Sequence, residues 1–402
     1  MNSFWDAPSC INFLHEISNK LMNGLIALLY LPAHAPKNIK AALKPVIGNG
    51  QAIRYENIKL DECKSDGYKP VESFLCNHFE LDINTETYVD KTPASIFEKT
   101  PSDIHRVIVF EKITPEILPH FKAFLIDLSR YNLSKPIYQR HKFVVILDPL
   151  IIKENDLPAE AGLSKLYFRN ISSSFDLTYM LRYQLKFNQC QTRILEESIA
   201  VSLSRFDFHL CEFLSSSTDI LSEYNHYLTA YANQNNWSTL TYTPINNLTP
   251  EQVWKCWASG ILEFIGDEAY YNTAYLAIHK QSWYVENAVW LSLLKSLLPM
   301  IEEYRIRLIE CKKIILPFKH QNEFGVVKSN KYDFEIGDIL MMLNTNQIQF
   351  KYIPTYEKAK IKQFIILCKT IRDDLAHLKI PKTYDIVSFK NSISTIQNII
   401  AN

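Results

Sequence analysis

Continuous apolar runs alternate with amphipathic segments over the first half of the chain. Runs bounded by turn-forming or charged residues predict strands buried on both faces. They lie at Leu25–Leu31, Arg106–Glu111, Lys142–Leu147 and, more briefly, Lys165–Phe168. Segments with helical periodicity separate them, at Ser9–Met22, Lys37–Ile47, Thr114–Tyr131 and Asp176–Gln184. Strands that alternate with helices predict a mostly parallel sheet with right-handed crossovers, and therefore an α/β domain.

The periodicity changes from about Thr192, where apolar residues begin to recur at helical spacing. A polar, turn-rich stretch at residues 235–249 marks a boundary. Four or five helices are predicted beyond it, beginning near Thr249, Trp283, Asp333, Thr355 and Tyr384. We therefore expect an α/β domain at residues 1–190, a helical connector at 191–249 and a helical bundle at 250–402.

Two acidic residues, Glu111 and Asp148, stand at the ends of predicted strands, and the loop Pro32–Pro36 after the first strand contains two prolines and no glycine. Over roughly residues 20–190 the order of elements resembles the core of AAA-type P-loop ATPases, with Glu111 at the position of the Walker B acid and Asp148 ending a sensor-like strand. The phosphate-binding pattern G-x-x-x-x-G-K-[ST] is missing. Because proline lacks an amide donor and the backbone cannot wrap around phosphates without glycine, we expect a degenerate domain without ATPase activity. The expected fold class is α/β plus all-α, a mostly parallel P-loop-like sheet followed by a helical bundle.

A polar motif lies in the helix predicted at Thr355–Leu378. Arg372 and His377 differ by about 140° around a helix of 3.6 residues per turn, so both side chains can reach one groove. Asp373 and His377 are four residues apart on one face. Histidine titrates near neutral pH and suits proton transfer in RNA cleavage without metal, and arginine can stabilise the phosphorane.

This spacing resembles the R-x4-H signature of HEPN domains, helical bundles found in many bacterial defence and toxin ribonucleases. The resemblance implies a metal-independent ribonuclease in which His377 is the general base or acid, Arg372 stabilises the phosphate and Asp373 orients His377. It also implies a homodimer, or a partner protein in a defence or toxin–antitoxin complex, with RNA as substrate. A catalytically silent helix end carrying the same residues is the other interpretation of the pattern.

Composition narrows the possible chemistry. The chain has 43 Lys and Arg against 43 Asp and Glu, so any contact with RNA must be local. Its eight cysteines form no C-x-x-C pair and its histidines no H-E-x-x-H, so neither a metal nor another cofactor is expected. The N-terminal segment lacks a signal-peptide pattern, and no apolar run reaches the roughly 18–20 residues of a membrane span. We therefore expect a cytoplasmic protein with no membrane contact.

Two further functions stay open. The chain can be a non-enzymatic scaffold or regulatory subunit, which the missing phosphate loop and the zero net charge favour. Residual nucleotide binding without hydrolysis is the other possibility, in which Lys37 or Lys40 would face an anion. Lysines on a first helical turn are more often simply solvated.

Overall fold

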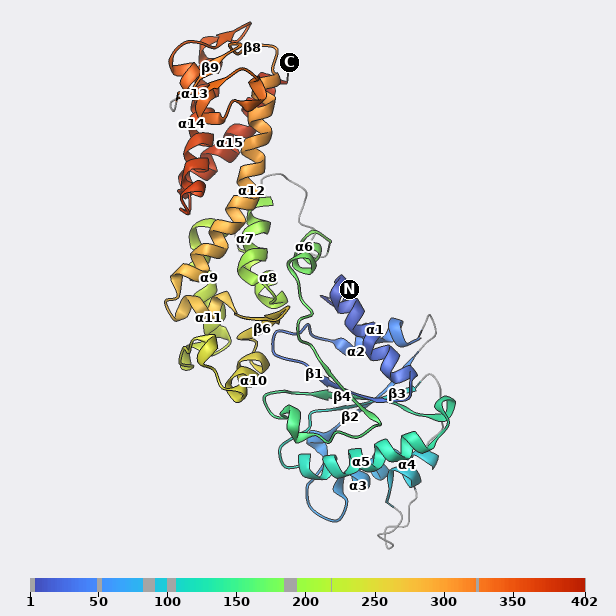
Figure 1. The fold of residues 1–402 in the computed structure, drawn as a ribbon. Coiled ribbons are helices and arrows are strands. Elements are labelled where there is room, and N and C mark those ends of the chain that lie inside the picture. The colour runs from blue at the N-terminus through green and yellow to red at the C-terminus, as the bar shows by residue number, and fades with distance from the viewer. Residues whose placement is uncertain are drawn as a thin grey trace. The chain divides into compact units, whose positions relative to one another are not determined.

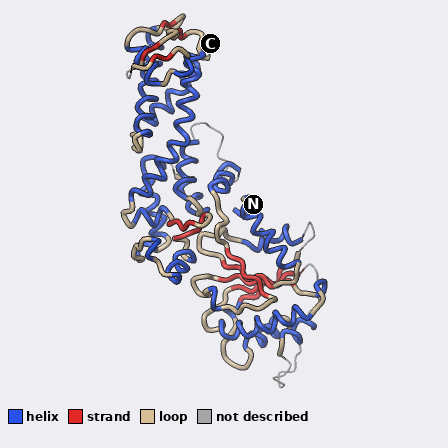
Figure 2. The backbone as a smooth tube through the Cα atoms, in the orientation of Figure 1, coloured by secondary structure: helices blue, strands red, loops and turns tan. Residues whose placement is uncertain are grey.

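The computed structural model describes residues 4–48, 53–81, 91–99, 106–183, 194–217, 219–322 and 325–401. They belong to two compact units (Figures 1 and 2). The first comprises Met1–Lys186, Ser204–Glu212 and Gln234–Tyr275, and the second Phe187–Leu203, Phe213–Asn233 and Leu276–Asn402. The units interleave along the sequence, whereas the sequence analysis divides the chain into three consecutive segments; that division remains a prediction.

A five-stranded sheet forms the centre of the first unit. Its strands are β1 (Ile26–Tyr30), β2 (Arg54–Lys59), β3 (Arg106–Glu111), β4 (Lys142–Leu147) and β5 (Leu163–Tyr167). All neighbours pair in parallel, in the order β2-β3-β4-β1-β5. Every residue of β1 is buried, because a parallel sheet is covered on both faces. The predicted fold class is confirmed in its main features, a parallel α/β domain joined to a helical region.

Helices cover the two faces of this sheet. α1 (Pro8–Met22) and α2 (Ile39–Gly48) lie on one face, and α3 (Pro70–His78), α4 (Pro93–Lys99) and α5 (Leu118–Ser134) lie on the other (Figure 1). The helix predicted from Thr114 begins only at Leu118; residues 115–117 form a turn before it, in which the Leu118 amide donates to the Thr114 carbonyl at 3.0 Å. The sequence analysis did not find β2, since only Ile58 in that strand is fully buried.

The first unit also contains α6 (Ser174–Tyr183), α10 (Pro250–Ala258) and an antiparallel hairpin of β6 (Leu262–Ile265) and β7 (Glu268–Tyr271). The predicted start of α10 is confirmed: the Thr249 hydroxyl accepts from the Gln252 amide, and the Gln252 side chain accepts from the Thr249 amide at 2.8 Å. The hairpin was not predicted. The apolar residues that recur at helical spacing beyond residue 192 lie on two helices, α7 (Ile194–Ser204), which up to Leu203 belongs to the second unit, and α8 (Phe208–Ser215), and Arg205 between them adopts a φ of 54°.

The second unit is mainly helical. Its remaining elements are α9 (Ile220–Gln234), α12 (Ser282–Glu310), α13 (Ile336–Asn344), α14 (Thr355–Ala376), α15 (Thr383–Ile400) and the short strands β8 (Ile314–Ile315), β9 (His320–Gln321), β10 (Val327–Lys328) and β11 (Gln349–Phe350); α11 (Thr273–Ile278) precedes α12. β8 pairs with β11 and β9 with β10, both antiparallel. Aromatic contacts join three helices: the ring of Phe364 lies 5.3 Å from Tyr304 and 5.4 Å from Phe389.

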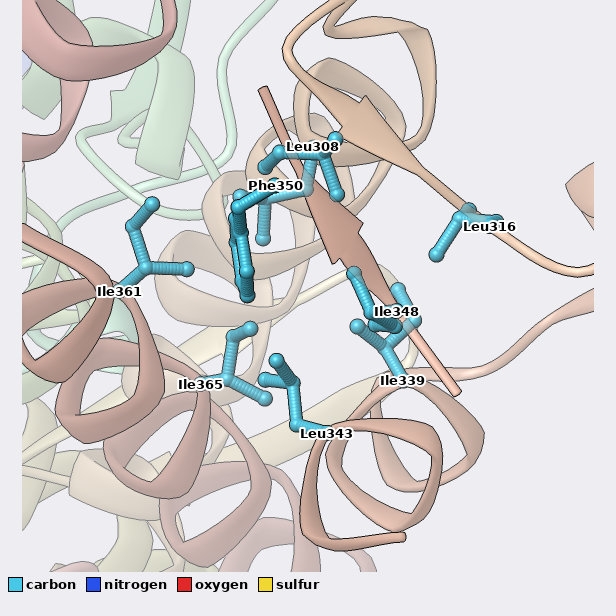
Figure 3. A pocket seen from close by; sticks show the side chains of 9 residues that line it. Leu308, Leu316, Ile339, Leu343, Ile348, Phe350, Ile361 and Ile365 are labelled. Atoms are coloured by element: carbon cyan, nitrogen blue, oxygen red, sulfur yellow. The ribbon is translucent and has the colours of Figure 1, made fainter. Parts of the chain in front are cut away.

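Apolar side chains from α12, β8, α13, β11 and α14 converge in this unit, among them Phe350 and Ile361 (Figure 3). The space left between them is about 10 Å³, roughly what one water molecule needs, and it has no polar lining. It is therefore a gap in a packed core. None of the described helices is long and apolar enough to cross a membrane.

Candidate functional site

The carboxyl ends of β1, β3 and β4 lie side by side, because β4 pairs in parallel with β3 on one side and with β1 on the other. A cavity of about 580 Å³ opens at this edge of the sheet. Its polar lining includes Asp61, Glu111, Lys112 and Asp148, and the rest is mainly aliphatic. Ligands of open α/β sheets bind outside the carboxyl ends of the strands, so this cavity is the candidate functional site.

The loop that connects β1 to α2 forms one wall of the region. The Ala33 amide donates to the Ala258 carbonyl at 2.9 Å, and the Ala35 amide donates to the Pro32 carbonyl at 2.9 Å. Pro32 and Pro36 have no amide hydrogen to offer. A phosphate-binding loop needs several amides that point at the ligand, and here two residues have no amide hydrogen and two further amides are engaged by the protein.

A buried hydrogen bond fixes this loop to the β6–β7 hairpin. His34 Nε2 lies 2.7 Å from Glu263 Oε2, and both side chains are buried almost completely. The other oxygen of Glu263 accepts from the amides of Asn170 and Phe264 at 3.2 and 2.6 Å. The His34 ring lies 5.2 Å from that of Phe206. The hairpin thus packs against the loop and holds its backbone in place.

The basic side chains near the cavity are paired with its acids. Lys40 Nζ lies 3.0 and 2.8 Å from the two carboxylate oxygens of Glu111, and Lys112 Nζ lies 3.0 Å from Asp61 Oδ2. The Asp148 carboxylate accepts from the Leu150 amide at 2.9 Å, as in an Asx-turn. With three carboxylates and two lysines, the region offers no excess positive charge to a polyphosphate.

An aromatic cluster supports the cavity from the side of β5 and α10. The rings of Tyr30 and Tyr167 stack at 5.0 Å, Trp254 lies edge-on to Tyr30 at 5.6 Å, and Trp254 Nε1 donates to the Pro149 carbonyl at 2.7 Å. Burial raises the pKa of Tyr30, and the carboxylates of Glu154 and Asp156 add to the effect. The phenol is therefore neutral and packs as part of the core.

The residues that the sequence motif singled out lie elsewhere, at the C-terminal end of α14. Arg372 and Asp373 are on the helix, and His377 is its C-cap residue and is exposed. Arg372 donates to Glu335 at 2.5 Å, and Asp373 accepts from Lys369 at 2.5 Å. The backbone amide of His377 donates to the backbone carbonyl of Asp373 at 3.1 Å. The Asp373 carboxylate is paired with Lys369.

Sequence reasoning found the strand-end acids Glu111 and Asp148 but missed three residues of the site. Asp61 follows β2, whose polar sequence concealed the strand. His34 and Glu263 are 229 residues apart, and no local pattern relates them. Lys40 was considered as an anion contact, and the structure shows it bound to Glu111. Over the described residues, no group of three or more His, Cys, Asp or Glu side chains is placed to hold a metal ion.

Comparison with known proteins leaves the family open. No family model matches the sequence, and neither does any curated protein. Among solved structures, the chain is similar to the crystal structure of Cdc6p from Pyrobaculum aerophilum, with 11% sequence identity, a TM-score of 0.34, and coverage of 98% of this chain and 86% of that one. A similarity of this size carries no argument about function, so the site must be interpreted from its own geometry.

Proposed function

We propose that the α/β unit is a non-hydrolysing relative of P-loop ATPases that serves as a scaffold or regulatory subunit. One observation carries the proposal: the loop after β1, where a P-loop protein holds phosphate, is closed by hydrogen bonds to Ala258 and Glu263. The ion pair between Lys40 and Glu111 supports the same conclusion, because the lysine and the acid that would act on a nucleotide and its metal neutralise each other.

The mouth of the cavity suits contact with another protein. Leu150 and Ile151 line it and are 57% and 42% exposed. Neighbouring exposed aliphatic side chains beside a cavity are typical of interaction sites. A partner segment with an apolar side chain could occupy this space without any phosphate chemistry.

The experiment is a thermal melt of the full chain with and without ATP and magnesium, together with a phosphate-release assay. We expect no hydrolysis and no rise in melting temperature. Binding would be visible, because a ligand that binds only the folded state at 100 times its Kd stabilises that state by about 2.7 kcal/mol. Lys40→Ala should leave both results unchanged. A melting shift with ATP that Lys40→Ala abolishes would establish residual nucleotide binding and overturn the proposal.

A second candidate function is RNA cleavage by a HEPN-like module in the second unit, within a defence or toxin-type system. The observation that favours it is the position of Arg372 and His377 on the last turns of one helix, where His377 is exposed and Arg372 is partly so. A second copy or a partner could complete the site from outside. In this assignment His377 transfers the proton, Arg372 stabilises the phosphate, and Asp373 has to leave Lys369 to orient His377.

This candidate is tested with labelled RNA in the absence of metal, comparing the wild type with Arg372→Ala and His377→Ala and recording the mass of each in solution. Cleavage by a dimer that both substitutions abolish would establish the ribonuclease. Equal cleavage by wild type and His377→Ala would eliminate this assignment. Lys369→Ala, which frees Asp373, provides a matched control and should retain or raise the activity.

A further inference from the structure

A group of lysines and one tyrosine lies where β11 leads into α14 in the second unit. Phe350 pairs with Ile314 across the β8–β11 ladder, and the Lys351 amide donates to the Lys313 carbonyl at 2.9 Å. The ladder therefore brings the turn at Lys312 and Lys313, directly before β8, beside the segment of Lys351 and Tyr352, although the two segments are far apart in sequence. We call Lys312, Lys351, Tyr352, Lys358 and Lys362 the lysine surface.

The apolar neighbours of these residues point inward, which turns the lysines outward. Phe350 and Ile361 point into the core of the unit (Figure 3). Lys351, the residue directly after β11, is exposed. Lys358 Nζ lies 5.6 Å from the centroid of the Phe350 ring, and Lys362 is one turn further along the same face of α14.

The charge of this surface is not neutralised. In the part of the chain that the structure describes, Lys312, Lys351, Lys358 and Lys362 form no ion pair. The acids closest in sequence, Glu310 and Glu357, form no ion pair with these lysines among the described residues; they accept from the Tyr332 and Tyr356 hydroxyls at 3.5 and 3.1 Å. Lysines one helical turn apart repel each other, and an anion would relieve that repulsion.

Tyr352 adds an aromatic face to the same surface. It is 95% exposed, the largest exposure among the exposed large apolar and aromatic side chains of the described residues. Its neighbour Ile353 is buried, whereas Lys351 on its other side is exposed. A ring held in water beside cations is the arrangement on which a nucleic-acid base stacks while phosphates contact the lysines.

We propose that the lysine surface binds a single-stranded polynucleotide. The lysines contact successive phosphates, and Tyr352 stacks on a base between them. An anionic membrane fits less well, because a membrane-binding face needs apolar side chains beside its lysines, and here Ile314, Ile353 and Ile361 are buried. With a net charge of zero for the whole chain, binding is confined to this local concentration of charge.

This inference is independent of both functions proposed above. The surface is at the N-terminal end of α14, and the Arg372–His377 motif is at the C-terminal end. The 15 residues from Lys362 to His377 correspond to roughly 22 Å along a helix with a rise of about 1.5 Å per residue. Binding to DNA, which lacks the 2′-hydroxyl needed for this cleavage, can be measured whether or not the chain cuts RNA.

The test measures fluorescence anisotropy of labelled oligo-uridine and oligo-thymidine with the full chain at several salt concentrations. The variant Lys351→Glu/Lys358→Glu/Lys362→Glu should bind at least about tenfold more weakly, and the slope of log K against log salt should fall in magnitude by about 0.7 for each phosphate contact removed from a single strand. Tyr352→Ala should weaken binding and leave that slope unchanged. Thermal melting checks that each variant is folded.

The matched control is Lys64→Glu/Lys99→Glu/Lys295→Glu, which makes the same charge change at three other exposed lysines. It should bind like the wild type. The proposal is overturned if the wild type binds neither strand, if the control weakens binding as much as the variant, or if the wild type binds only vesicles of phosphatidylcholine and phosphatidylserine. Binding to RNA alone, DNA alone or both supports it and identifies the sugar preference.

Discussion

His34 Nε2 and Glu263 Oε2 lie 2.7 Å apart in the interior of the α/β unit and connect the loop after β1 to the β6–β7 hairpin. His34 Nδ1 has no hydrogen-bond partner among the described residues. Because a buried N–H without an acceptor costs more than an unused lone pair, we assign the hydrogen to Nε2, where it is donated to the carboxylate. This bond holds the loop in the form that leaves no phosphate cradle.

Replacing His34 should therefore destabilise the protein. His34→Ala leaves Glu263 Oε2 without its donor and opens a space against Phe206, so we expect a loss of about 2–5 kcal/mol in the free energy of unfolding. Urea denaturation measures it. His15→Ala, at an exposed position on α1, should change the value by less than about 0.5 kcal/mol. Similar losses in the two variants would mean that the buried bond contributes nothing.

Gly260 allows the close approach of the chain to this loop. Its φ is +75°, and a Cβ placed there would lie 3.2 Å from the His34 amide nitrogen. Gly266 has a similar φ of +64° with no atom within 4 Å of such a Cβ, so it provides a matched control. Gly266→Ala should cost about 1–2 kcal/mol from backbone strain alone, and Gly260→Ala should cost more. Equal thermal shifts in the two variants would show that the contact with His34 is not restrictive.

Glu72, in the first turn of α3, should make stability depend on pH. Burial raises the pKa of this carboxyl and outweighs the lowering by a backbone hydrogen bond and by Lys69; Asp127 raises the pKa slightly further and His120 lowers it slightly. The folded state therefore binds the proton more tightly than the unfolded state, and stability declines as pH rises from the ordinary glutamate pKa through the raised one. Glu72→Gln should raise the melting temperature at neutral pH, with the gain disappearing in acid.

Glu116→Gln is the control of opposite sign. Hydrogen bonds, led by that from the Thr114 side chain, lower the pKa of Glu116, so its contribution is present at neutral pH and is lost as pH falls through the lowered value. Its glutamine variant should be no more stable than the wild type at neutral pH. Melting curves of both variants across pH measure the difference. A gain for both, or for neither, would contradict the assigned effect of burial at Glu72.

Substitutions at the end of α14 should leave the fold intact. The partner of Arg372 is the exposed Glu335, and His377 is itself exposed, so Arg372→Ala and His377→Ala should each change the free energy of unfolding by less than about 1 kcal/mol. Leu375→Ala, at a fully buried position between them, should cost about 2–5 kcal/mol. Denaturation of the three variants checks this, and larger losses at Arg372 or His377 would make their cleavage assays uninterpretable.

The sequence predicted those elements whose burial produces a continuous apolar run or a regular apolar face. β1, β3 and β4 are apolar along their length because both faces are covered, and α12 and α14 carry a regular apolar face. β2 was not predicted because most of its residues are not fully buried, and the β6–β7 hairpin was not predicted because each of its strands has only four residues. A strand or helix can be predicted from its own residues only where enough of them are buried to make the apolar pattern recognisable.

By itself the sequence determined that the sheet is parallel, that Glu111 ends one strand and Asp148 follows another, and that the loop after β1 contains two prolines and no glycine. Only the tertiary structure decided that Lys40 neutralises Glu111, that Glu263 holds His34, and that Arg372 is paired with Glu335. The physical reason is that strand and helix formation follow from neighbouring residues, whereas the partner of a charged side chain is chosen by whichever distant segment the fold brings within hydrogen-bonding distance.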